Sequence, residues 1–221
     1  MDVFEQIATC VSRGKIKKDS PYPPDMRDQD GVDELVRDSL SNGVDPNDVL
    51  TKGLMVGMSE VGKKFSRNEV FVPDLLMAAK AMTAGMDQLK PAFESGAAKR
   101  RGVFIVGTVQ GDLHDIGKNL VRMMMEGAGY EVIDLGVDVA PEKFLAQVDE
   151  RPGSIVGLSA LLTTTMVNMD KTTKMIKEKH PDTMVVVGGA PLTQEFCDKI
   201  GADAYSADPQ AIMEWLDSKF E

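Results

Sequence analysis

Short apolar runs alternate with helix-patterned segments throughout the second half of the chain. The runs are rich in β-branched residues, whereas the segments between them carry apolar residues three and four positions apart. Five such β-α units predict a flavodoxin-like (Rossmann-like) α/β domain, with a parallel five-stranded sheet and right-handed crossovers. The expected strands are 103–106, 131–135, 155–159, 184–187 and 203–205, and the expected helices are 118–127, 141–149, 166–179, 192–200 and 209–219.

The first half of the chain shows helical periodicity alone. Apolar residues recur at helical spacing over about 1–14, 31–41, 45–65 and 72–91. Asp45-Pro46 is typical of a helix start, and Pro91 is expected to end the last helix because proline removes a backbone donor. Four helices joined by short connections predict an all-α four-helix bundle.

A change of period near Gly102 divides the chain. We expect a helical bundle (cap) domain over 1–91, a linker over 92–101 and the α/β domain over 102–221. The bundle contains a proline-rich insert near 15–30, and its three prolines predict an extended connection there.

Charge and composition narrow the classes of partner. The net charge of -10 leaves no basic face for nucleic acid. No apolar run reaches membrane-spanning length, and the N-terminus lacks a signal pattern, so we expect a cytoplasmic protein with neither nucleic acid nor a membrane as its partner. Cys10 and Cys197 stand alone, which argues against a disulfide framework or a cysteine zinc site.

The candidate chemistry lies in the stretch 111–119, between the first expected strand and its helix. Asp112 stands two residues before His114, one of two histidines in the chain. A loop at the carboxyl end of a parallel strand is where ligands bind in open α/β sheets. An imidazole that binds a metal needs an acceptor on its other nitrogen, which Asp112 can supply. An ordinary polar surface loop is the alternative interpretation.

Two further loops belong at the same edge of the sheet. Residues 159–165 are rich in hydroxyls, and Gly188-Gly189-Ala190 follows the fourth strand. The segment 107–111 lacks the Gly-x-Gly-x-x-Gly spacing of a dinucleotide site, and the chain has no phosphate loop. His180 is expected in an exposed turn, so a metal at His114 would need most of its ligands from a cofactor, which means a macrocycle.

Three separated motifs follow one another along this half. Asp-x-His-x-x-Gly, Ser-x-Leu and Gly-Gly are formed by Asp112, His114 and Gly117, by Ser159 and Leu161, and by Gly188 and Gly189. Together they resemble the cobalamin-binding domain family. Residues 62–65 and 70–82 resemble the helical cap over the corrin in methionine synthase and in small corrinoid methyl-carrier proteins of methylamine, methanol, methoxy-aromatic and betaine systems. The proline-rich insert departs from that pattern by its length.

The resemblance implies a cobalamin (methylcobalamin or a related corrinoid) as cofactor and gives roles to single residues. His114 would be the lower cobalt ligand, Asp112 would hydrogen-bond His114, and Thr165 would be the third member of the relay. The cap residues Phe65, Phe71, Val72 and Leu75 would shield the upper face, although a bundle core demands the same apolar residues. The remaining implied cofactor-binding residues are Gly111, Leu113, Asp115, Ile116, Gly117, Ser159, Leu161, Thr163, Gly188, Gly189 and Ala207.

The function that the resemblance implies is methyl transfer on cobalt. The chain would carry a methyl group from a substrate:corrinoid methyltransferase to a second methyltransferase, which delivers it to tetrahydrofolate or a thiol. A reductive activase would be a third partner, and the chain alone would turn over nothing. Two alternatives are the small subunit of an adenosylcobalamin mutase and a cobalamin-dependent sensor.

Overall fold

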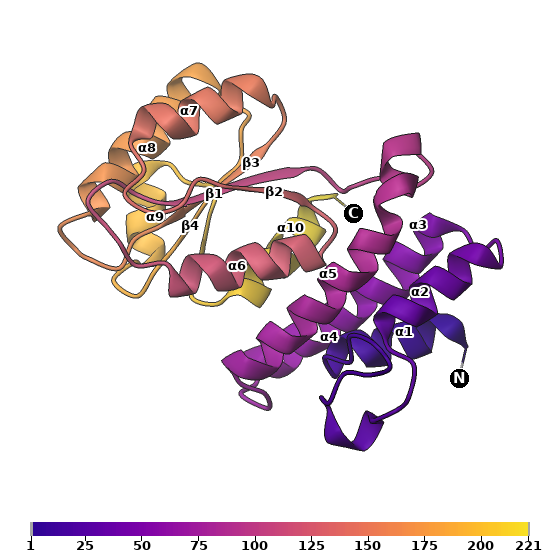
Figure 1. The fold of residues 1–221 in the computed structure, drawn as a ribbon. Helices are drawn as coiled ribbons and strands as arrows, with labels where there is room; N and C mark the ends of the chain where they lie inside the picture. Colours follow the sequence, from indigo (N-terminus) through magenta and orange to yellow (C-terminus); the bar gives the residue numbers. More distant parts are fainter. Residues whose placement is uncertain (1, 221) are drawn as a thin grey trace. The chain divides into compact units, whose positions relative to one another are not determined.

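The computed structural model describes residues 2–220. They form two compact units (Figure 1). One unit extends to Arg101 and includes Gly127–Gly129, and the other comprises Gly102–Glu126 and the chain from Tyr130 onward. No helix within residues 2–220 is both long and apolar enough to cross a membrane.

The first unit is helical, as its periodicity predicts. Its core is formed by one apolar face of each helix, with Ile7, Val36, Met58 and Leu89 among the fully buried side chains. The first helix is stabilised by a capping box between Asp2 and Glu5. The elements are α1 (Val3–Ser12), the 3₁₀ turn η1 (Pro24–Met26), α2 (Val32–Ser41), α3 (Pro46–Asp48), η2 (Val49–Leu54), α4 (Met55–Ser66) and α5 (Val72–Ser95).

The helix that contains Pro91 is longer than predicted. α5 continues through Pro91 to Ser95 and ends at Gly96, which takes a left-handed conformation. The expectation that Pro91 ends this helix was therefore wrong, and the first four residues of the expected linker 92–101 are helical. Pro91 can donate no bond to the carbonyl of Asp87, but both residues are exposed, so water can satisfy that carbonyl.

A second difference concerns the segment predicted as one helix over 45–65. It contains the π-helical stretch η2, in which Val49, Leu50, Gly53 and Leu54 are all buried. The wider turn of a π-helix brings these four positions to one side. Apolar spacing predicted the helix but not this local widening.

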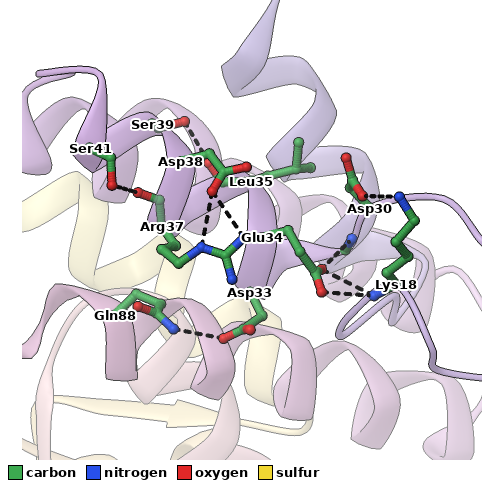
Figure 2. Close-up of polar contacts among 11 residues, drawn as sticks. Lys18, Asp30, Asp33, Glu34, Leu35, Arg37, Asp38, Ser39, Ser41 and Gln88 are labelled. Atoms are coloured by element: carbon green, nitrogen blue, oxygen red, sulfur yellow. Dashed lines mark hydrogen bonds and ion pairs between the residues drawn. The ribbon is translucent and has the colours of Figure 1, made fainter.

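The proline-rich insert is bound to the start of α2 (Figure 2). The Glu34 carboxylate accepts the Gly31 N–H at 2.9 Å and the Lys18 N–H at 3.1 Å. Lys15 is fully buried, and its ammonium donates to the carbonyls of Lys18 and Ser20 at 3.2 and 3.1 Å. A side chain at Gly31 would come within 2.4 Å of the Lys17 nitrogen, so the segment packs too closely there for any residue but glycine.

The second unit is a five-stranded parallel sheet in the order β2-β1-β3-β4-β5. In Figure 1, α6 and α10 cover one face, whereas α7, α8 and α9 cover the other. The strands are β1 (Val103–Thr108), β2 (Glu131–Asp134), β3 (Ile155–Ser159), β4 (Val185–Gly188) and β5 (Ala204–Ser206), and the helices are α6 (Ile116–Gly127), α7 (Pro141–Glu150), α8 (Met166–Lys179), α9 (Gln194–Ile200) and α10 (Pro209–Phe220). The predicted fold class is confirmed.

The strand order determines where a ligand can bind. The chain passes from β1 to β2 on one side and returns to β3 on the other, so the connections after β1 and β3 leave in opposite directions. In open α/β sheets this reversal opens a crevice at the carboxyl ends of the two strands. The loops that follow Thr108 and Ser159 therefore border the expected binding position.

The insert allows a test of its attachment. Glu34→Ala removes the acceptor of two backbone N–H groups and is expected to lower the free energy of unfolding by about 1–2 kcal/mol. Amide hydrogen exchange over 15–31 should accelerate. Glu60→Ala is the control, because Glu60 makes only a 3.9 Å ion pair with Lys64 on the surface and should change stability by less than about 0.5 kcal/mol. Equal exchange protection in both variants would contradict this account of the insert.

Candidate functional site

A carboxylate removed from water lies at the centre of the site. Asp112 is 0 % exposed and follows β1 in the loop that leads to α6. Its Oδ2 accepts the Leu161 N–H at 2.7 Å, the Leu162 N–H at 3.1 Å and the Thr165 hydroxyl at 2.9 Å. These donors all belong to the connection between β3 and α8. Asp112 thus joins the two loops that border the crevice.

The same hydrogen bonds determine the charge of Asp112. Burial by itself would raise its pKa, but the donors from Leu161, His114 and Thr165 outweigh burial and hold the pKa well below its ordinary value. The side chain is therefore a carboxylate at neutral pH, and it can only accept hydrogen bonds.

His114 is oriented by this carboxylate. Its ring Nδ1 lies 2.7 Å from Asp112 Oδ1. The same oxygen accepts the backbone N–H of His114 at 3.1 Å. The buried Thr108 hydroxyl donates to the His114 carbonyl at 2.8 Å. Because Asp112 only accepts, Nδ1 carries the proton and Nε2 keeps its lone pair. The His114 side chain is 50 % exposed, and none of its polar contacts within residues 2–220 involves Nε2.

The other predicted loop residues gather at the same edge of the sheet. Ser159 pairs in register with Thr108 of β1 and with Gly188 of β4, so all three strand ends are level. A side chain at Gly189 would come within 1.8 Å of the Ala160 carbonyl oxygen, so the backbone forms a cradle that only glycine permits. Thr163 is exposed in the loop after β3, and Ala207 is exposed directly after β5.

Exposed apolar side chains lie on both of the loops that Asp112 joins. Leu113 and Ile116 are 71 % and 72 % exposed. Leu161, Leu162 and Val167 are also exposed large apolar residues, and they come from the β3–α8 connection and the first turn of α8. An apolar surface around one available imidazole nitrogen is suited to a large, flat ligand that carries its own metal.

The remaining predicted residues belong to the helical unit. Phe71, just before α5, is 67 % exposed, whereas Phe65 and Val72 are partly buried. Leu75 is completely buried.

Several residues of the site were not singled out from the sequence. Thr108 is a hydroxyl at the end of an apolar strand, and that position was a usable signal. Asp138 accepts the Gly111 N–H at 2.7 Å, but its participation depends on a contact across 27 residues. Leu162 contributes a backbone N–H, which no side-chain motif can indicate.

The residues present fit a corrinoid better than a bare metal ion. Among residues 2–220, no group of three or more His, Cys, Asp and Glu side chains could hold a metal. His180 adds no ligand here, because it ends α8 and its Nε2 lies 2.7 Å from Oδ1 of Asp149 in α7. The structure offers one imidazole with a fixed tautomer, an apolar surface and a glycine cradle, and a cofactor with its own equatorial ligands needs these features.

Comparison with known families gives two matches along the chain. A B12 binding domain matches residues 102–213, and a second B12 binding domain matches residues 26–90. The first match contains the loops around His114, and the second contains α2 to most of α5.

Curated relatives are corrinoid proteins. The chain is 42 % identical over 182 residues to trimethylamine corrinoid protein 2 of Methanosarcina mazei, with 80 % of this chain and 84 % of that protein covered. It is 45 % identical over 166 residues to dimethylamine corrinoid protein 1 of Methanosarcina acetivorans, with 74 % and 78 % covered.

Solved structures agree over nearly the whole chain. A cobalamin-binding protein from Desulfitobacterium hafniense is 31 % identical with a TM-score of 0.76, and the match covers 99 % of this chain and 98 % of that one. The methanol:cobalamin methyltransferase complex MtaBC from Methanosarcina barkeri gives 29 % identity and a TM-score of 0.81, with 98 % and 78 % covered. With both B12 binding domains in place, the chain belongs to the family of corrinoid proteins, and its cofactor is a cobalamin-type corrinoid.

Proposed function

We propose that this chain carries a methyl group on its corrinoid between two methyltransferases. The observation that carries the proposal is the 2.7 Å contact between His114 Nδ1 and the buried Asp112 carboxylate, which leaves Nε2 available beside an apolar surface. When bound, the corrinoid supplies a cobalt centre that accepts and gives up the methyl group. The protein's part is to hold, orient and cover that group.

His114 is the residue that would hold the cobalt. The Asp112 carboxylate fixes the ring tautomer and makes Nε2 a better electron donor. Asp112 in turn is held by donors from the β3–α8 loop, so the imidazole bonds to a carboxylate that is itself fixed. The direction of Nε2 is therefore set by the sheet.

Thr165 completes the relay. Its hydroxyl lies 2.9 Å from Asp112 Oδ2 and 2.8 Å from the Leu162 carbonyl. One hydroxyl proton can serve either acceptor, so Thr165 can strengthen or release its bond to Asp112 as the charge on the Asp112–His114 pair changes. We assign Thr165 the role of adjusting this pair.

The nucleotide tail of the cofactor would lie along the edge formed by β3, β4 and β5. Gly188 and Gly189 allow a ligand to approach the backbone closely, and Ser159 and Thr163 offer hydroxyls. Ala207 would border the far end. Phe71, the exposed aromatic of the helical unit, is the strongest of the four cap residues as a cover for the upper face.

We assign the methyl donor to the methylamine class. The curated relatives that support this assignment are trimethylamine and dimethylamine corrinoid proteins, which are 41–45 % identical to this chain. The structure of a methanol:cobalamin methyltransferase complex supports a substrate methyltransferase as one partner. A second methyltransferase that delivers the methyl group to tetrahydrofolate or a thiol, and a reductive activase, would complete the system.

Loss of the imidazole tests the cofactor site. The chain reconstituted with hydroxocobalamin and desalted should retain the corrinoid and show histidine-nitrogen coupling in the EPR spectrum of the cobalt(II) state. His114→Ala should remove that coupling and weaken retention by about 10–100-fold. His180→Ala is the control and should leave the spectrum unchanged, because His180 bonds to Asp149. Unaltered coupling in His114→Ala would show that His114 is not the cobalt ligand.

Loss of the buried charge tests the relay. Asp112→Asn places an amide against N–H donors and should cost about 2–3 kcal/mol of folding free energy, because bonds to a charged acceptor are the strong ones. Urea unfolding of the α/β unit measures this cost. Asp182→Asn, at an exposed turn of the same unit, should cost less than about 0.5 kcal/mol. Equal unfolding midpoints for the two variants would show that Asp112 is not held as described.

The carrier role is tested by transfer between two partners. With the corrinoid reduced, methyl loading should require a substrate methyltransferase, and a trimethylamine or dimethylamine enzyme should load the chain at least about tenfold faster than a methanol enzyme. The loaded corrinoid is followed by its absorption spectrum. Faster loading by the methanol enzyme would overturn the methylamine assignment, and steady turnover of free methylamine without any partner would overturn the carrier role.

A further inference from the structure

We propose that Lys118 and Asp134 are positioning residues for His114. The buried Lys118 and the partly exposed Asp134 form an ion pair that, through Asn119 and Asp115, fixes the start of α6 and with it the loop that carries the imidazole. This inference rests on the proposed function, since it concerns how the chain presents His114 to the corrinoid.

A continuous chain of polar contacts supports the proposal. Lys118 Nζ lies 2.7 Å from each oxygen of Asp134 and 2.8 Å from Asn119 Oδ1. Asn119 Nδ2 then donates to Asp115 Oδ2 at 3.0 Å. Asp115 directly follows His114, so the contacts run without a break from the end of β2 to the neighbour of the imidazole.

The core of the domain does not need a cation at this position. Lys118 is 3 % exposed and lies on the same side of α6 as the buried Met125, where helical spacing calls for an apolar residue. An ammonium removed from water is costly unless it is paired, and here its partner is the partly exposed Asp134. A paired lysine at this position therefore adds directional contacts that methionine could not make.

Asp138, in the connection between β2 and α7, holds the part of the loop that precedes His114. Asp138 accepts the Gly111 N–H at 2.7 Å and donates its own N–H to the Asp112 carbonyl at 2.9 Å. Its φ of 53° is uncommon for a residue other than glycine, and it brings the side chain and the N–H to the same loop.

The two sides of the loop are thus held by different strands. β2 and β3 flank β1, and the residues after β3 hold Asp112, whereas Asp134 and Asp138 act from the β2 side. Asp112 determines which way the ring faces. Lys118 and Asp134 determine the position of the whole loop relative to the sheet. The contacts of Asp112 with the residues after β3 cannot do this alone.

The test measures coordination and not activity. The full chain is reconstituted with hydroxocobalamin, and the fraction of bound corrinoid with histidine-nitrogen coupling is read from the cobalt(II) EPR spectrum. Lys118→Met should retain the corrinoid, but the ratio of histidine-bound to histidine-free cofactor should fall about tenfold. Lys118→Arg keeps the cation and should restore most of the ratio. Lys177→Met is the matched control, because it breaks another 2.7 Å lysine-aspartate pair of the same unit, beside the start of β5.

Each outcome decides the proposal. Asn119→Ala breaks the link but leaves the ion pair, so it should lower the ratio even if Lys118→Met fails to fold. Wild-type ratios in the folded Lys118 and Asn119 variants would overturn the inference, even with lower melting temperatures. In that case the wild type and both variants would bind the corrinoid through His114, so the proposed function would stand while the role of Lys118 would not. A wild-type chain that retains no corrinoid would overturn both.

Discussion

A buried carboxylate must accept hydrogen bonds from protein donors, and the site depends on how the fold supplies these donors to Asp112. The donors are a side chain and two backbone N–H groups about fifty residues further along the chain, together with the ring and backbone of His114. No local segment could supply them. Only the parallel pairing of β1 with β3 brings both loops to the same edge.

This constraint joins stability to chemistry. The bonds that keep Asp112 charged also fix the proton on His114 Nδ1, and so the lone pair on Nε2. A binding residue on a flexible loop would lose orientation each time a ligand left. Here the loop is held from β3 through Asp112 and from β2 through Asp134 and Asp138, so the imidazole is organised before any cofactor arrives.

The site around His114 offers an apolar surface and a single nitrogen ligand. Its sequence neighbours Leu113 and Ile116 are apolar and exposed, and the backbone at Gly189 lies close to that of Ala160 at the same edge of the sheet. Such a surface can cover a large ring but offers a metal only one ligand. The relatives that share over 40 % identity with this chain are named for different methylamines.

The sequence alone determined the fold class and the order of the elements, and it indicated the loop in which Asp112 and His114 form a pair. Apolar periodicity reports directly on helices and strands, and the spacing of Asp112 and His114 reports on a local pair. The cofactor followed from the resemblance carried by three motifs and is confirmed by the family match.

Only the tertiary structure decided what depends on contacts between distant segments. Lys118 reads as a surface lysine until α6 lies on the sheet and Asp134 faces it. Thr108 and Asp138 become part of the site through partners 6 and 27 residues away. The passage of α5 through Pro91 and the widened turn at η2 were missed for a related reason. Periodicity records which side of an element is buried, whereas the partner of a polar group is set by how separate elements come together.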